Sequence, residues 1–193
     1  GELLALAGDV RAARQSGTVL SPFIYLTAFT RGMGPASLVW DIPDSLPVEL
    51  DGYINFDNQY HGPMRVRTAA AFDYVVPMLS VLQQVGTANA WITAEQSGIN
   101  SLAGFTQDNA YGPVLEDGRV SLLEVTQAYS MFANQGNLAG ARRPTAGQNS
   151  GNGQIQPVSV LQVSDHSGLT WPVQTPETRP VTTAQLAFLV NDI

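Results

Sequence analysis

The chain has 193 residues, of which 44% are hydrophobic, and its formal net charge is −7. This composition supplies enough apolar material for the core of one domain and excludes global disorder. The negative charge is the opposite of what a nucleic-acid-binding protein needs, so we expect no nucleic-acid partner. All nine basic residues are arginines, which excludes a phosphate-loop lysine, a Schiff base and a Ser-x-x-Lys base. No cysteine is present, so disulfides and thiolate metal sites are excluded as well.

The chain begins with an apolar run bounded by glycines, which predicts a buried strand over residues 2–7. It ends at Ile193 inside a predicted helix. Because both ends interrupt predicted elements, we expect residues 1–193 to be one domain that is truncated at both ends. No apolar run in the sequence approaches the length of a membrane span.

Residues 15–32 predict the helix around which the rest of the chain is organised. A turn at Gly17 leads into a run whose apolar residues recur at helical spacing, and a basic residue followed by glycine ends it. Pro22 fits in the first turn, where its missing N–H costs nothing. Thr18 and Ser21 are three residues apart and would share one face at the helix N-terminus. The unpaired N–H groups at that end suit an oxygen nucleophile, and they equally suit a simple cap.

Residues 41–47 are rich in proline and predict a loop, in which Asp41 and Asp44 are expected to face water. Two consecutive helices are predicted within residues 64–86. Asp73 stands between them and is the expected N-cap of the second helix.

The second half of the chain predicts a capped helix, a loop and a hairpin. Ser121 and Glu124 form a Ser-x-x-Glu capping box before an apolar run. The segment 137–156 is rich in Gly, Asn, Gln and Ser and predicts a mobile loop. Thr182 with Gln185 could cap the last helix. The other predicted elements are a short helix over 90–101, the capped helix to residue 136, a hairpin around 165–168 and a final helix over 184–193.

Two segments resemble the penicillin-binding proteins. The family's active-site helix begins Pro-Gly-Ser-x-x-Lys-Pro-Phe, and Gly17, Pro22 and Phe23 stand on matching positions. Residues 120–136 are very similar to the family's Val-Thr-Leu-Leu-Glu-Leu-Thr-x-Ala-Tyr-x-x-Phe-Ala-Asn-x-Gly helix. The resemblance covers nearly the whole chain and is greatest to the transpeptidase domain of class A, bifunctional members. It implies an α/β (α+β) fold of the penicillin-binding-protein and serine β-lactamase type. Such a fold has a central antiparallel sheet flanked by helices, and a helical subdomain.

Laid on the family's motifs, this chain departs at the catalytic positions. Thr18 falls on the nucleophilic serine of the first motif, and Ser21 falls on its lysine. Asp73 falls on the serine of the second motif, Ser-x-Asn, and Val75 falls on the asparagine that holds the substrate amide. The third motif, Lys-Thr/Ser-Gly, is absent from a chain without lysine. The resemblance therefore implies a degenerate site, with Thr18, Ser21 and Asp73 at catalytic positions and Val75 at a substrate-binding position.

Three functions follow from this resemblance. The domain could be a pseudo-enzyme that serves binding or scaffolding in peptidoglycan synthesis. It could be an active D,D-transpeptidase or carboxypeptidase in which Thr18 takes the acyl group and Asp73 takes its proton. It could also be a structural subunit of a larger assembly.

The resemblance also implies partners and a location. The expected ligands are peptidoglycan stem peptides or β-lactams, and other proteins are further candidate partners. An upstream membrane anchor and a glycosyltransferase domain are expected in the remainder of the chain, with an extracytoplasmic location. No cofactor is expected. No metal is expected either, because His61 and His166 are far apart in the sequence and lack companion ligands.

Overall fold

The structure, a computed structural model, describes residues 7–105, 111–115, 118–143, 154–158, 160, 162–172 and 176–193. All but the last residue of the strand predicted over 2–7 lie outside these ranges. The helices are α1 (Ser21–Thr30), α2 (Val66–Ala71), α3 (Val75–Val85), α4 (Thr87–Gln96), α5 (Gly112–Leu115), α6 (Leu122–Ala133) and α7 (Ala184–Asn191), with 3-10 turns η1 (Gly17–Leu20), η2 (Val48–Leu50) and η3 (Asn100–Leu102). The strands are β1 (Arg14–Gln15), β2 (Leu38–Asp41), β3 (Gly62–Arg65), β4 (Arg119–Val120), β5 (Asn137–Arg143), β6 (Gln154–Gln156), β7 (Gln162–Ser164), β8 (Thr170–Pro172) and β9 (Glu177–Pro180).

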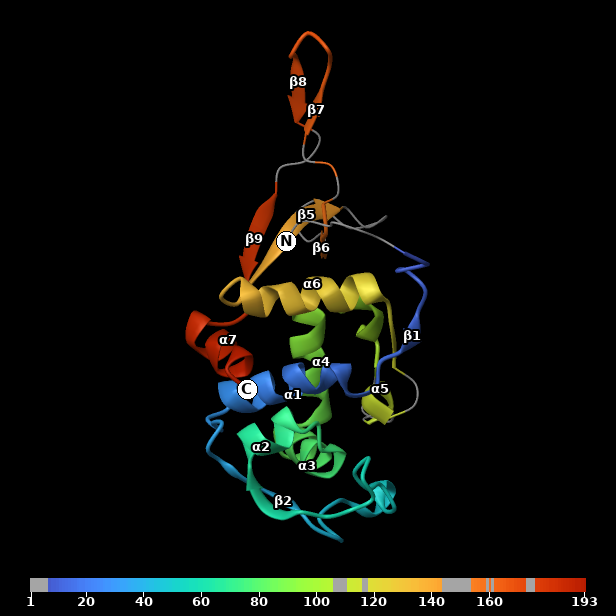
Figure 1. Cartoon of the computed structure of the whole chain (residues 1–193), viewed down its shortest axis with the longest axis vertical. Helices are drawn as coiled ribbons and strands as arrows, with labels where there is room; N and C mark the ends of the chain where they lie inside the picture. Colours follow the sequence, from blue (N-terminus) through green and yellow to red (C-terminus); the bar gives the residue numbers. More distant parts are fainter. Residues whose placement is uncertain are drawn as a thin grey trace.

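Helix α1 lies at the centre of the molecule, below α6 and above α2 and α3 in Figure 1. Every residue from Phe23 to Phe29 is buried, so this helix is apolar all round, as a helix enclosed by others must be. It packs against α3, α4 and α7. Pro22 lies in its first turn and Arg31 caps its end, which confirms the prediction for this segment.

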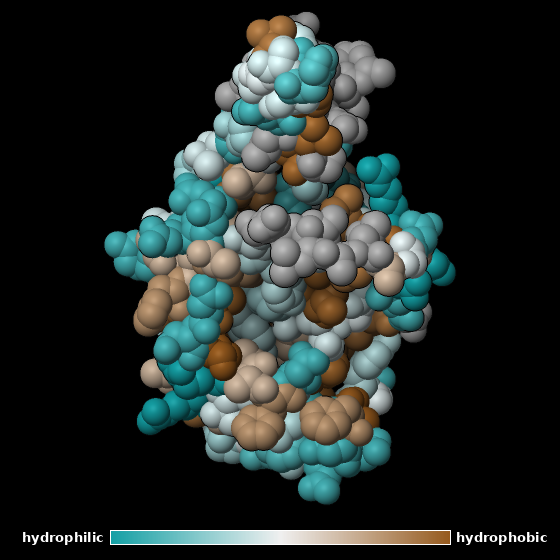
Figure 2. All heavy atoms as spheres, turned by 45° about the horizontal axis from the view of Figure 1, so that its top comes forward, coloured by the Kyte–Doolittle hydropathy of each residue, from teal (hydrophilic) through white to brown (hydrophobic). Residues whose placement is uncertain are grey.

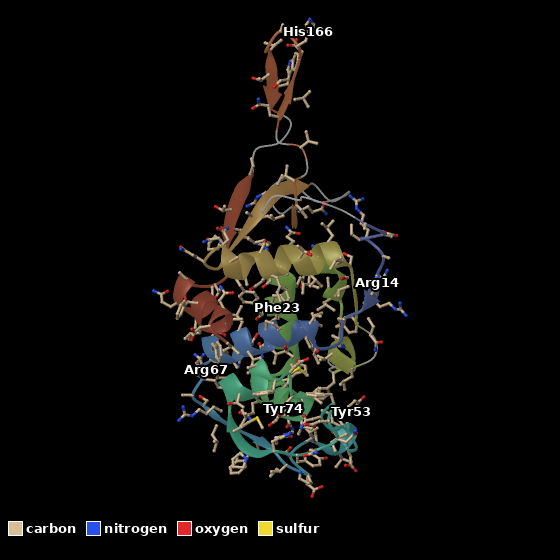
Figure 3. The ribbon with its side chains drawn as sticks, viewed as in Figure 1. Arg14, Phe23, Tyr53, Arg67, Tyr74 and His166 are labelled. Carbon is tan, nitrogen blue, oxygen red and sulfur yellow. The ribbon has the colours of Figure 1, made fainter. Side chains whose placement is uncertain are left out.

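Helix α6 covers the other side of α1 and begins where its capping box predicts. The Ser121 side chain accepts from the Glu124 N–H, and the Glu124 carboxylate accepts from the Ser121 N–H. Figure 3 shows Phe23 between α1 and α6. Its ring meets Phe132 at 5.5 Å and Tyr129 at 5.8 Å between centroids, so aromatic packing joins the two helices.

A three-stranded antiparallel sheet in the order β6-β5-β9 lies beyond α6. Strand β5 is the middle strand, and Gly140 is required there, because a Cβ at this position would overlap the carbonyl oxygen of Gln156 on β6. The hairpin β7–β8 extends beyond this sheet, away from the helices, and carries His166 at its tip (Figures 1 and 3). The predicted hairpin is thus confirmed.

The segment 137–156 differs from its prediction as a loop, because strands occupy both of its ends. Residues 144–153 between these strands lie outside the described ranges, and mobility there stays a prediction. The cap of the final helix was also misplaced. Thr183, rather than Thr182, is the N-cap of α7, and its hydroxyl accepts from the Leu186 N–H at 3.4 Å.

The surface has no single dominant apolar area on the face drawn in Figure 2, where hydrophobic side chains form small patches among hydrophilic ones. Among the described helices, none combines the length and the hydropathy that crossing a bilayer requires.

Candidate functional site

The turn that carries Thr18 is held on both sides by residues distant in the sequence. On one side, the Ser16 N–H donates to the Gly118 carbonyl at 2.8 Å, and the buried Ser16 hydroxyl donates to the Pro113 carbonyl. On the other side, the Tyr129 hydroxyl on α6 donates to the Val19 carbonyl at 2.8 Å. The 3-10 turn η1 therefore enters α1 in a fixed position, with Thr18 half-buried at its surface.

Thr18 and Asp73 meet, although 55 residues separate them. The Thr18 hydroxyl donates to the Asp73 carboxylate, with 2.6 Å between Oγ1 and Oδ2. Asp73 lies in the sharp connection between α2 and α3 and has a φ of 54°, in the left-handed region. The two helices and this kink bring its carboxylate to the entrance of α1.

The prediction that Asp73 caps the second helix was wrong. Tyr74 is the N-cap residue of α3 and makes no side-chain cap. Instead, the Asn55 side-chain oxygen accepts from the Val76 N–H at 3.2 Å and satisfies one free donor of that helix. The Asp73 carboxylate is thereby available for Thr18.

Ser21 and Val75, the other two predicted site residues, lie at helix starts. Ser21 is the first residue of α1 and Val75 is the first residue of α3, and both are half-buried. Within the described residues, no hydrogen bond joins either side chain to the Thr18–Asp73 pair. A serine hydroxyl at position 21 supplies no positive charge, and a valine supplies no polar group to a ligand.

A second polar cluster, which the sequence did not predict, supports the start of α3. Asp41 was expected to face water, but it is fully buried on β2. Its carboxylate accepts from the Asn55 amide at 2.8 Å and 2.9 Å and from the His61 N–H at 2.9 Å. The His61 ring lies between Asp41 and Asp57, with Nδ1 2.8 Å from one carboxylate and Nε2 3.0 Å from the other. Each nitrogen of the His61 ring therefore faces one carboxylate oxygen.

This cluster positions the candidate site indirectly. The same Asn55 that binds Asp41 also caps α3, and the His61 ring stacks on Tyr74 at 4.2 Å. Tyr74 directly follows Asp73, so the buried Asp41 fixes the backbone next to the site residue. Among the described residues, no group of three or more histidine, aspartate or glutamate side chains could hold a metal ion.

Tyr25 on α1 lies close enough to Asp73 to sense its charge. Burial and, second, the charge of Asp73 raise the pKa of Tyr25 above its ordinary value of 10.0. The Tyr25 hydroxyl is buried and has no hydrogen-bond partner among the described residues. The same two causes raise the pKa of Tyr129. Both hydroxyls therefore lose their protons at a higher pH in the folded chain than an exposed tyrosine does.

We expect the stability of the chain to fall as pH rises above about 10, where the unfolded chain loses tyrosine protons that the folded chain keeps. Tyr25 alone should contribute about 1.4 kcal/mol per pH unit in this range. No lysine titrates in the same window. Tyr25→Phe should reduce the decrease in the free energy of unfolding between about pH 10 and 11. It should not lower stability at pH 7, because no hydrogen bond is removed. Urea midpoints between pH 7 and 11 measure this effect. Tyr60→Phe, at a tyrosine that is 39% exposed, is the control, and an unchanged slope in Tyr25→Phe would contradict the prediction.

Comparisons with known proteins agree with the motifs. No family model matches the chain. Penicillin-binding protein 1A of Neisseria meningitidis is 30% identical over 132 residues, which is 66% of this chain and 16% of that protein. The crystal structure of penicillin-binding protein 1A from Haemophilus influenzae aligns with a TM-score of 0.69 at 20% identity, over 92% of this chain and 29% of that one. The chain is a transpeptidase-like domain related to the class A penicillin-binding proteins.

This penicillin-binding protein domain has the predicted fold class, since its structural neighbours are transpeptidase domains. The PonA1 protein from Mycobacterium tuberculosis, solved in complex with penicillin V, aligns with a TM-score of 0.68 at 19% identity, over 94% of this chain and 46% of that one. At such identities the likeness establishes the fold alone. The domain spans about one sixth of the length of the Neisseria relative. At its candidate site Thr18 meets Asp73, and the chain contains no lysine.

Proposed function

We propose that this domain is a transpeptidase-like binding or scaffolding module of a peptidoglycan-synthesis protein that does not form acyl-enzymes. The observation that supports this function most directly is the 2.6 Å hydrogen bond from Thr18 to Asp73 in a chain without lysine. The hydroxyl at the nucleophile position is bound to a carboxylate, and no amine is available to remove its proton.

The chemistry of the pair argues against acyl transfer. An aspartate carboxylate is a weaker base than a lysine amine by about six pKa units, so it holds a hydroxyl proton far less strongly. Among the described residues, no ion pair compensates the charge of Asp73. A stem peptide ending in D-alanine and a penicillin both carry a carboxylate. Asp73 would therefore repel the ligands that a positively charged site attracts.

A second candidate function, an active transpeptidase or carboxypeptidase, is favoured by the same contact. In that reaction, Thr18 Oγ1 forms a bond to the carbonyl carbon of a D-alanyl peptide or a β-lactam, and the carbon–nitrogen bond breaks. The Thr18 proton passes to Asp73 and then to the leaving nitrogen, so the carboxylate is regenerated. The short distance supplies the alignment that this step needs.

Incubation with a fluorescent penicillin separates the two functions. We expect no covalent label on the wild-type chain, while a penicillin-binding protein with an intact Ser-x-x-Lys motif is labelled in the same experiment. A stable adduct on Thr18 that Thr18→Ala abolishes would overturn the proposed function and establish the second one. An adduct that persists in Thr18→Ala would place the reaction at another residue and contradict both.

Family membership suggests the setting of this module. We place it on the extracytoplasmic side of the membrane, attached to an anchor and a glycosyltransferase domain in the remainder of its protein. Its partners there are other proteins of cell-wall synthesis, because Asp73 disfavours the carboxylate of a stem peptide.

A further inference from the structure

Three stacked aromatic side chains include the two residues that flank Asp73 in the sequence, and two of the three are exposed. Phe56 is 72% exposed and Phe72 is 58% exposed, while Tyr74, which stacks with both, is buried. The Tyr74 ring is nearly parallel to both, with centroids 6.2 Å from Phe56 and 5.6 Å from Phe72. We call Phe56, Phe72 and Tyr74 the aromatic surface. Covering two such rings would remove a substantial apolar area from water.

The charges around the aromatic surface are negative. Asp57 follows Phe56, and Asp73 stands between Phe72 and Tyr74. The His61 ring, which stacks on Tyr74, lies between the carboxylates of Asp41 and Asp57, so acidic groups outnumber the basic group at this cluster. The faces of aromatic rings are themselves electron-rich. The complementary occupant is therefore a cation with an apolar or planar body.

One carboxylate oxygen of Asp73 can still accept a hydrogen bond from such a cation. Its Oδ2 accepts from Thr18, and the described residues give its Oδ1 no hydrogen bond. Thr18 Oγ1, which donates to Asp73, keeps lone pairs that can accept. The planar guanidinium of arginine presents several N–H donors in a fixed fork and stacks on aromatic faces, whereas the ammonium of lysine is a compact point charge. The two acceptors and the Phe72 ring thus match a guanidinium best.

We propose that the aromatic surface together with Asp73 binds an arginine side chain of a partner polypeptide. This inference deepens the proposed function and rests on it, because it requires Thr18 to remain unacylated. The proposed partner is a positively charged segment. Its charge is opposite to that of a peptide that ends in a free carboxylate. Binding would also cover Phe56 and Phe72, which the fold leaves in water.

Titration of the 193-residue chain with the peptide acetyl-Gly-Arg-Gly-amide, followed by amide nitrogen–proton NMR, tests this proposal. The same peptide with neutral citrulline in place of arginine is the ligand control. We expect saturable shifts at the amides of residues 56–57 and 72–74 with the arginine peptide, and no saturation with the citrulline peptide. Equal binding of both peptides, or shifts that cluster elsewhere, would overturn the proposal.

Variants of the chain test the two contacts separately. Phe72→Leu should weaken binding about threefold by removing the stacking ring, and Asp73→Asn should weaken it about fivefold by removing the charge. Glu95→Gln removes the same charge from an exposed position on α4 and should leave affinity within about 1.5-fold. Equal losses in Glu95→Gln and Asp73→Asn would indicate general attraction to the net negative chain and refute the site. The titration involves no acylation, so its failure is distinguishable from penicillin labelling of Thr18.

Discussion

Phe23→Ala is expected to lower the free energy of unfolding by about 4 kcal/mol, the loss typical of a fully buried phenylalanine. The Phe23 side chain has no exposed surface, and its ring contacts Phe132 and Tyr129 on α6. Removing the ring leaves a cavity between the central helix and the helix that covers it. The surrounding helices α3, α4 and α7 also pack on α1, so the site cannot collapse freely to fill this cavity.

Urea unfolding of Phe23→Ala, monitored by tryptophan fluorescence and circular dichroism, measures this loss. Phe188→Ala is the matched control, because Phe188 is 62% exposed on α7 and should change stability by less than about 1 kcal/mol. Equal losses in the two variants would show that α1 is not the centre of the core. If Phe23→Ala does not fold, Phe23→Leu should still show a loss clearly larger than that of Phe188→Leu.

Asp41→Ala is expected to lower the free energy of unfolding by about 3 kcal/mol. The Asp41 carboxylate is fully buried, and its removal takes one acceptor from the Asn55 amide and leaves His61 Nδ1 without its carboxylate partner. Breaking a buried charged cluster by removing one member is costlier than losing a surface ion pair. The expected loss lies at the low end of what removing one partner of a buried ion pair costs. The reason is that the His61 side chain is 28% exposed, so water can reach it.

The same unfolding measurement on Asp51→Ala gives the control. Asp51 is an exposed aspartate that ends the turn η2, and its loss should stay within about 0.5 kcal/mol. A loss in Asp41→Ala no larger than in Asp51→Ala would contradict the burial and bonding described for Asp41. The NMR signals of residues 72–74 give a second readout. Asp41→Ala should shift them, because Asn55 connects Asp41 to the start of α3.

The helices of this chain were largely predictable because their signals are local. The capping box of Ser121 and Glu124 and the apolar spacing behind it determine where α6 begins. The connection between α2 and α3 was likewise visible from helical spacing. Strand β5 was not predicted, since its sequence contains one glycine, two alanines and no strongly β-favouring residue. Its strand conformation comes from pairing with β6 and β9, which local spacing cannot reveal.

The candidate site was predictable only in part. The resemblance placed Thr18 and Asp73 at motif positions and offered Asp73 as one possible acceptor of the Thr18 proton, yet no local pattern shows that the two side chains meet. The contact forms at a residue with left-handed backbone, for which the local pattern alone predicted a helix cap. The burial of Asp41 was missed for a similar reason, because its partners are 14 and 20 residues away. The i,i+4 spacing of Asp57 and His61 was a signal that could have drawn attention to this cluster.

The anchoring of the turn before α1 has a consequence for how such a domain can evolve. Ser16 and Val19 hold the turn through contacts to Gly118, Pro113 and Tyr129, and the Thr18 side chain makes none of these three contacts. The residue at position 18 can therefore drift between serine, threonine and other small side chains while the chain still folds. Selection can remove the chemistry and keep the shape, and the shape remains open to a new use.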